Sequence, residues 1–361
     1  MKTKEMKARR INIPAQAIES FIRDVLVMEK VVSSAAGYVA RGLVNTSLRG
    51  VDSHGIRLFP HYLRALKARR INPRPKYKFT KTSPSTGVLD ADHAFGHAAG
   101  MEAVRRAIEL ARSAGSGHVS VKNSSHFGAA AFYALEIAKR DMIGMSFTHA
   151  DSLMLTHNGK EPFLGTNPLC FAAPCEGEGP FCLDMATTML NFNKVIQSRE
   201  RKLDLPPGTG TDKDGNVTTD AGRVTNLLPI GQYKGFGLSL MIEILCSVLT
   251  GMPYGKKITS MYKDPIEKRR RLGHFFSAIR IDCFEDVGTF KKRLRQLLTD
   301  IRNEPRKCKD TAVQVAGDPE KASFRERSVK GIPVSLPEWE VLVKIQKEYG
   351  VSIGKVKYAK T

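Results

Sequence analysis

The stretch Val121-Lys-Asn-Ser-Ser-His-Phe-Gly-Ala-Ala-Ala-Phe-Tyr133 decides how the centre of the chain folds. Residues 118–121 have the composition of a short buried strand, and the small residues after Gly128 predict a helix that runs through Ala138. The polar residues between these elements therefore lie at a strand-to-helix turn, where α/β proteins usually place their active groups. His126 is the candidate for proton chemistry in this turn, and the alternative is a histidine that caps a buried turn.

Helical and extended segments alternate outward from this turn. Apolar residues at spacings of three and four predict a helix over residues 101–114, ended by Gly115 and Gly117. Further strands are predicted over residues 87–91, 143–148, 181–188 and 275–281, and further helices over residues 17–32, 33–43, 61–67 and 337–349. The apolar run 237–252 contains Glu243 and is too short to cross a bilayer comfortably, so we predict a core helix there. The alternation as a whole predicts an α/β protein.

The composition limits the class of protein. A chain of 361 residues with 42% hydrophobic residues can bury a sizeable core and has room for two domains. Its six cysteines form no CxxC pair and show no metal-ligand spacing, which predicts reduced thiols, no metal site and a cytoplasmic location. Residues 1–10 are charged and lack the apolar segment of a secretory signal.

The formal net charge of +21 predicts attraction of anions, including nucleotides, carboxylates and nucleic acids. Local basic clusters lie at residues 7–10, 67–70, 268–271 and 291–295. They lack interleaved aromatic residues, zinc-finger spacing and an RNP pattern, so we interpret each as solvated surface. A nucleic-acid-binding protein stays only as a distant alternative, and we expect neither nucleic acid nor a membrane as a partner.

Several familiar site motifs are absent from the sequence. No Gly-x-Gly-x-x-Gly follows a predicted strand, so an ordinary Rossmann fold is not indicated. The Walker loop, His-Glu-x-x-His and Gly-x-Ser-x-Gly are missing as well, which leaves nucleophilic hydrolase chemistry without support.

Six short motifs occur in order along the chain, and together they are specific. They are Asp52-Ser-His-Gly55, Asn123-Ser-Ser-His-Phe-Gly128, Gly165-Thr-Asn-Pro168, Leu183-Asp-Met-Ala-Thr187, Leu227-Leu-Pro-Ile-Gly231 and Tyr233-Lys-Gly-Phe-Gly237. In these motifs the chain resembles the malate/L-lactate dehydrogenase family that lacks a Rossmann fold. The resemblance runs from about residue 17 to the last predicted helix.

This resemblance implies an enzyme that uses NAD or NADP to interconvert a small 2-hydroxy acid and its 2-oxo acid, of the malate, lactate or ureidoglycolate type. An NADPH-dependent reductase of a cyclic imine such as Δ1-piperideine-2-carboxylate is the alternative within the same fold. The resemblance also implies a homodimer. It further implies a three-layer, mixed-sheet cofactor domain, here residues 81–284, and a mainly helical domain built from residues 1–80 and 285–361.

The resemblance also assigns roles to individual residues. His126 matches the general acid/base and His54 the second active-site histidine, while Arg57 and Asn167 are the candidates for binding substrate. The residues expected to contact the cofactor are Ser125, Gly165, Thr166, Asp184, Met185, Ala186, Lys234, Gly317, Asp318 and Pro319.

Residue chemistry agrees with these roles. Oxidation of a hydroxy acid must remove the hydroxyl proton, and a histidine with an ordinary pKa of ~6.5 exchanges that proton near neutral pH. Better-known family members carry arginine four residues after the first histidine, whereas this chain has Leu58 there and Arg57 one position earlier. A shift of one residue can reverse the direction of a side chain.

Other polar residues have structural interpretations. We expect four of the remaining histidines to be structural, namely His93, His97, His118 and His274. Asp184 ends a predicted strand, so its alternative role is to cap a helix. Asp151 has the same two interpretations and is not among the catalytic candidates.

Overall fold

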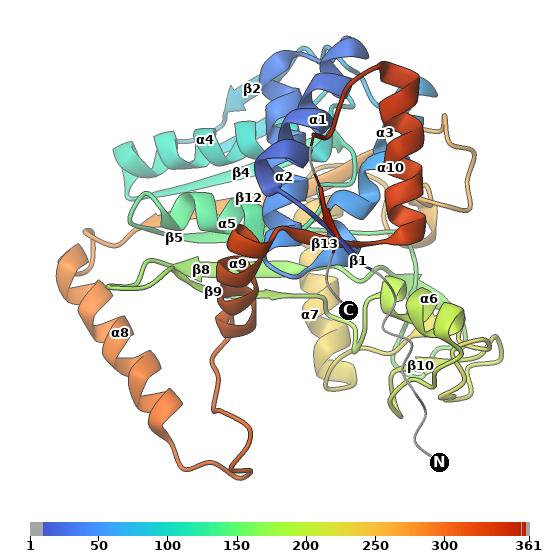
Figure 1. Ribbon diagram of the computed structural model, residues 1–361. Helices are drawn as coiled ribbons and strands as arrows, with labels where there is room; N and C mark the ends of the chain where they lie inside the picture. The colour runs from blue at the N-terminus through green and yellow to red at the C-terminus, as the bar shows by residue number, and fades with distance from the viewer. Residues whose placement is uncertain (1–9, 355, 359–361) are drawn as a thin grey trace.

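A seven-stranded mixed sheet organises the computed structural model, which describes residues 10–354 and 356–358 (Figure 1). Its strand order is β2-β3-β4-β12-β5-β8-β9. In that order the strands are Lys78–Lys81, Thr86–Asp90, Ser116–Ser124, Leu272–Arg280, Met142–Thr148, Leu169–Ala173 and Phe181–Met185. Only β3 and β4 pair in parallel among these neighbours. The predicted α/β fold without a Rossmann arrangement is therefore confirmed.

Helices cover both faces of this sheet. On one face α4 (Gly96–Ala114) packs against β4 and β12, and α5 (Ala131–Ala138) packs against β5 and β8. On the other face lie α7 (Tyr233–Glu243) and the π turn Ile244–Val248 that continues it. The side chains of β12 alternate accordingly, with Phe276 in the core beneath α4 and α5 and Phe275 in the cluster beneath α7.

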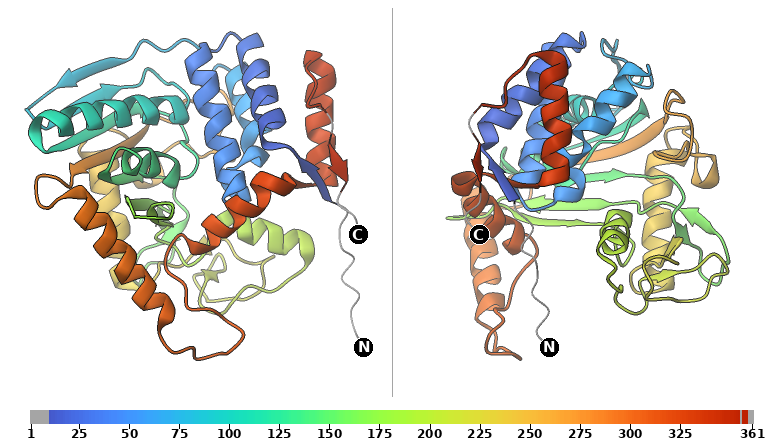
Figure 2. Two further views of the ribbon diagram at one scale, coloured as in Figure 1. Left: turned by 60° about the vertical axis from the view of Figure 1, so that its left-hand side comes forward. Right: turned by 45° about the vertical axis from the view of Figure 1, so that its right-hand side comes forward.

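The first and last described strands lie side by side (Figure 2). Strand β1 (Arg10–Ile13) pairs antiparallel with both β13 (Ile332–Ser335) and β14 (Lys357–Tyr358). One buried cluster joins these strands to the terminal helices α1 (Ala15–Met28), α2 (Ser33–Leu48), α3 (Phe59–Lys67) and α10 (Leu336–Tyr349).

The helix α8 (Val287–Asn303) contacts a different part of the molecule from the terminal helices. Its Lys291 Nζ lies 3.0 Å from an Asp141 oxygen just before β5, and its Arg302 pairs with Glu178 in the β8–β9 loop at 2.9 Å. It is followed by α9 (Asp318–Lys330). The proposed domain boundaries at residues 80 and 285 stay predictions.

A small satellite sheet lies beyond the end of β5. Its four strands are β10 (Gly210–Thr211), β11 (Asn226–Leu227), β6 (Met154–Leu155) and β7 (Pro162–Leu164). The helix α6 (Phe192–Arg201) packs on it through the buried Val195. This unit places Asn193 Nδ2 3.2 Å from the carbonyl oxygen of Ser53, beside the first histidine motif.

The prediction of a core helix over residues 237–252 is wrong in two respects. The helix begins at Tyr233, and only one of its sides is buried, through residues such as Ile242 and Cys246. The opposite side leaves Ile244 and Val248 49% and 62% exposed. Because the segment is apolar on every side, its sequence could not show which side meets the sheet. Among the described residues, no helix is long and apolar enough to span a membrane.

Candidate active site

The end of β4 is shaped by two backbone features. Asn123 has a φ of 53°, in the left-handed region that asparagine tolerates, and its amide donates to both Asp90 carboxylate oxygens at 3.1 Å. Gly96, at the start of α4, lies directly against the turn, and a Cβ there would come 2.5 Å from the carbonyl oxygen of His126. These features direct the chain from the strand into the Ser125-His126 turn.

His126 is held by a tyrosine and lies beside a second histidine. Its Nδ1 is 2.6 Å from Tyr62 Oη, which comes from α3. Its ring stacks on that of His54 with centroids 5.7 Å apart and planes inclined by 23°. Residues 126 and 54 are thus brought together as predicted. Tyr62 was missed, because the sequence placed it only in a basic helix with nothing to link it to the histidine motif.

The surroundings keep both imidazoles neutral. Burial lowers the pKa of His54 to about 4, and its Nδ1 lies 2.9 Å from Ser53 Oγ. Burial, and then the neighbouring His54, hold the pKa of His126 well below 6.5. Burial raises the pKa of Tyr62 well above 10, so its phenol stays protonated. A neutral His126 can accept a proton at one ring nitrogen while Tyr62 engages the other.

A cavity of about 150 Å³ opens beside His54. Its lining includes Thr166, Asp184, Met185 and Ala186, four of the residues predicted to contact the cofactor. Asp184 Oδ2 accepts a hydrogen bond of 2.9 Å from the backbone N–H of Ala131, at the start of α5. Burial raises the pKa of this carboxyl to about 6. Asp184 therefore caps a helix and lines the cavity at the same time, which unites the two interpretations of this residue.

Residues that the sequence did not single out complete this cavity. Asn45, Arg49 and Glu320 line it, together with the small residues 128–131 that follow the histidine turn. Arg49 Nη2 is buried and has no hydrogen-bond partner among the described residues. Arg49 directly follows α2, and nothing in the local sequence distinguishes it from an ordinary solvated arginine.

The other predicted cofactor residues do not line this cavity. Ser125 is buried, and Gly165 lies tightly against the backbone of Ala150. Lys234 is exposed in the first turn of α7.

Residues 317–319, at the start of α9, lie next to the cavity, since Glu320 belongs to its lining. Gly317 has a φ of 94° and lies against the backbone of Cys182, which favours glycine there. Asp318 pairs with Arg302 at 2.7 Å, and Pro319 follows in the first turn of α9.

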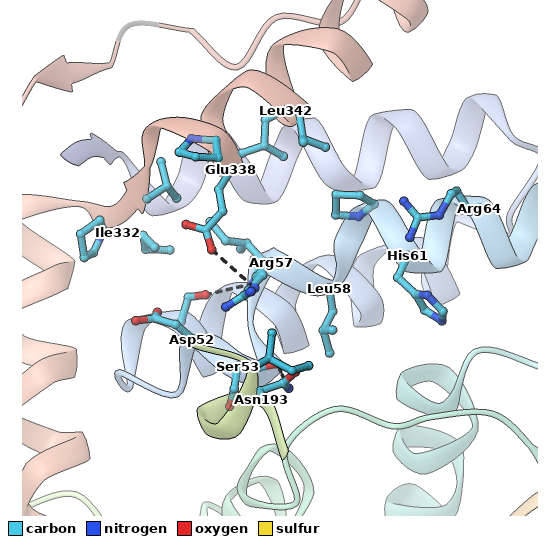
Figure 3. Close-up of a pocket in the computed structure, with 18 of the residues that line it drawn as sticks. Asp52, Ser53, Arg57, Leu58, His61, Arg64, Asn193, Ile332, Glu338 and Leu342 are labelled. Carbon is cyan, nitrogen blue, oxygen red and sulfur yellow. Dashed lines mark hydrogen bonds and ion pairs between the residues drawn. The ribbon is translucent and has the colours of Figure 1, made fainter. Parts of the chain in front are cut away.

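The two residues predicted to bind substrate are placed elsewhere. Asn167 is fully buried, and its amide donates to Glu243 Oε2 at 2.8 Å and accepts from the backbone N–H of Ala150 at 3.0 Å. Arg57 lines a second, largely apolar cavity of about 430 Å³, where it points to Glu338, 3.7 Å away (Figure 3). Leu58 is buried. Neither Arg57 nor Asn167 lines the cavity beside His54.

The interpretation of two basic clusters as solvated surface is wrong for one arginine in each. Arg70 is 2% exposed and Arg270 is 3% exposed. Arg270 Nη2 donates to Asp151 Oδ1 at 2.6 Å. Asp151 is distant in sequence, so no local pattern could have shown that Arg270 turns inward.

Comparisons with known proteins agree on one family. The sequence profile described as malate/L-lactate dehydrogenase matches residues 13–343. The malate dehydrogenase of Pyrococcus abyssi is 34% identical over 351 residues, covering 94% of this chain and 96% of the relative. The L-sulfolactate dehydrogenase of Methanocaldococcus jannaschii is 35% identical over 338 residues, covering 93% and 96%.

The fold agrees as well. The crystal structure of malate dehydrogenase from Entamoeba histolytica superposes with a TM-score of 0.91 at 29% identity, covering 96% of this chain and all of that one. Cofactors named among the relatives are NAD(+) and NADP(+). The chain therefore belongs to the malate/L-lactate dehydrogenase family, a family of NAD- or NADP-dependent dehydrogenases of hydroxy acids.

Proposed function

We propose that this protein oxidises a small 2-hydroxy acid, or reduces the matching 2-oxo acid, with His126 as the general acid/base. The observation that carries the proposal is the His126 ring, bonded to Tyr62 and stacked on His54 beside the cavity that Asp184 lines. Removal of the hydroxyl proton needs a neutral base within reach of the substrate, and His126 is neutral at neutral pH.

The cavity fits part of a nicotinamide cofactor. The unpartnered Nη2 of Arg49 offers a donor to an anionic group, and the glycine and alanines at 128–131 allow close approach to the backbone. Asp184, Met185, Ala186 and Thr166 would hold the cofactor there. When bound, the nicotinamide supplies or accepts the hydride, and the protein positions the substrate and handles the proton.

Tyr62 fixes how His126 handles that proton. If Nδ1–H donates to the Tyr62 oxygen, the other ring nitrogen has a free lone pair for the substrate hydroxyl. In the reverse direction the protonated imidazole returns the proton to the carbonyl oxygen. His54, kept neutral by burial, stacks on His126 without adding a second positive charge.

Within the proposed class, the cyclic imine reductase stays the alternative. Its chemistry would use the same histidine as a proton donor, so the site geometry does not separate the two substrates. Turnover separates them: we expect reduced-cofactor absorbance to change with pyruvate-type or malate-type acids. Turnover of Δ1-piperideine-2-carboxylate alone would overturn the 2-hydroxy acid assignment. Running the panel with both NAD and NADP also identifies the cofactor.

We also propose that the enzyme is a homodimer. The exposed side of α7 and the following π turn presents Leu240, Ile244 and Val248, which are 42%, 49% and 62% exposed. A row of large apolar side chains on one helix favours burial against another protein surface.

A cytoplasmic location is proposed on different grounds: the six cysteines are all free thiols.

A further inference from the structure

Arg270 is a buried cation whose donors are only partly used. Its side chain is 3% exposed, and Nη2 donates to Asp151 Oδ1 at 2.6 Å. Nε and Nη1 are buried, and neither has a hydrogen-bond partner among the residues that the structure describes. Guanidinium groups stay charged, and buried donors are almost always bonded. Two open donors on one buried arginine therefore call for a further acceptor.

The topology brings Arg270 to the same edge of the sheet as His126. Strand β12 begins at Leu272, which pairs with Ser124 at the end of β4. His274 bonds Ser124 Oγ at 2.8 Å and Thr148 Oγ1, at the end of β5, at 2.7 Å. Arg270 precedes this junction by two residues, and His126 follows it by two. The two side chains thus leave adjacent strand ends.

Two buried arginines in this region, Arg70 and Arg270, have one direct carboxylate partner between them in the described part of the chain, Asp151. Asp151 is shared, because its second oxygen accepts from Ser260 Oγ at 3.0 Å and from the backbone N–H of Met261 at 3.2 Å. The equally buried Arg70 donates only to the carbonyl oxygens of Met261 and Pro265, which carry no charge. The field of Arg270 reaches the active site, where it helps to lower the pKa of His126. An anion beside Arg270 would supply an acceptor for its open donors.

We propose that Arg270, oriented by Asp151, binds the carboxylate of the substrate. This rests on the proposed function, since a 2-hydroxy or 2-oxo acid supplies the missing acceptor. The position where better-known relatives carry arginine is the buried Leu58. Arg57 lines the other cavity and faces Glu338, and the Asn167 amide is occupied. Among the described residues, Arg49 and Arg70 also have an open donor, but Arg270 has two and is the arginine whose charge acts on His126.

The test compares a charged substrate with a neutral analogue. We expect wild-type enzyme to prefer pyruvate, or the best acid of the panel, over its methyl ester. Arg270→Met should lower kcat/KM for the acid about 10- to 150-fold and for the ester much less, because one charge-assisted contact is lost. Arg270→Lys should recover part of the preference. Arg269→Met is the matched control, since Arg269 is the exposed neighbour.

Two further measurements separate the possible failures. Cofactor binding, followed by reduced-nicotinamide fluorescence, should be unchanged in Arg270→Met and so reports a folded site. Oxamate binding to the enzyme–cofactor complex should weaken by the same 10- to 150-fold factor. If wild type turns over no acid yet binds oxamate through Arg270, the proposed function fails and the anion site stands. The assignment to Arg270 is overturned if Arg270→Met keeps the wild-type preference for acid over ester and the wild-type affinity for oxamate. It is also overturned if Arg57→Met, and not Arg270→Met, loses that preference and that affinity. If Arg270→Met does not fold, Arg270→Lys is measured in its place for the acid-over-ester preference and for oxamate affinity. Wild-type values of both in Arg270→Lys would then overturn the assignment.

Discussion

At the scale of single residues, the proton chemistry depends on one hydrogen-bonded imidazole. His126 lies at a strand end, bonded at Nδ1 by Tyr62 and stacked on His54. Each contact comes from a different element, so the sequence could place His126 and His54 in the site but could not supply the tyrosine.

Replacing His126 tests its role directly. His126→Asn should leave a folded protein that binds cofactor normally, with kcat lowered roughly 10²- to 10⁴-fold because the acid/base is gone. His118→Asn, a histidine on β4 outside the site, is the matched control. Near-normal kcat in purified His126→Asn would remove this residue from the reaction.

Tyr62 has a smaller expected effect, because it acts through His126. In Tyr62→Phe the 2.6 Å bond to Nδ1 is lost while the ring is kept. We expect kcat to fall roughly 10-fold, with the KM for the acid nearly unchanged. The measurement is a steady-state comparison at several pH values, since loss of this bond should also shift the pH profile of kcat. A variant with the wild-type kcat and profile would show that Tyr62 only packs against the histidine.

At the scale of elements, close backbone contacts set the position of the histidine turn. In Gly96→Ala the new Cβ would meet the His126 carbonyl oxygen at 2.5 Å, so α4 or the turn must shift. We expect a loss of about 1–3 kcal/mol in the free energy of unfolding together with reduced kcat. Gly37→Ala on α2, where nothing lies within 4 Å, should be neutral or slightly stabilising. Urea denaturation and turnover of the two variants check this, and equal behaviour would contradict it.

The exposed side of α7 gives a second prediction at this scale. If this side forms the proposed dimer interface, Val248→Glu places a charge in an apolar contact and should yield a folded monomer. Light scattering after gel filtration measures the mass. Val329→Glu on α9, where the side chain is 85% exposed, is the control. A Val248→Glu protein with the wild-type dimeric mass would place the interface elsewhere.

At the scale of the whole molecule, buried histidines couple stability to pH. Burial lowers the pKa to about 4 for His54 and to about 3 for His97 and His274. Below pH ~6.5 the unfolded chain protonates them and the folded chain does not, so stability is lost as the pH falls. Asp184 opposes this, because burial raises its folded pKa to about 6 and the folded state then binds the extra proton.

These three histidines and Asp184 give a net difference of roughly two protons between pH 6 and 5. His61 and His126, whose pKa values are also lowered, add to it, so the predicted loss in the free energy of unfolding is at least about 3 kcal/mol per pH unit. Urea denaturation at pH 7, 6 and 5 measures it. His97→Gln serves as a comparison, since it removes one titrating group and should reduce the slope. A free energy that stays constant down to pH 5 would show that these histidines are not kept neutral.

The sequence by itself determined the family, the α/β class and the histidine turn. Six motifs carry that information because each encodes local geometry within a few residues, such as the left-handed Asn123 at the end of β4. Helix and strand periodicity likewise depends on neighbours close in the chain, so most elements were predicted within a few residues of their observed ends.

Only the tertiary structure decided which residues of similar local sequence turn inward. Arg269 and Arg271 are exposed while Arg270 between them is buried, because Asp151, 119 positions away, meets only the middle residue. The same holds for the occupied amide of Asn167, whose partner Glu243 lies 76 positions along the chain, and for the exposed side of α7. Burial and pairing across such separations are set by how the strands are ordered in the sheet, and a linear pattern of residue types does not contain that order.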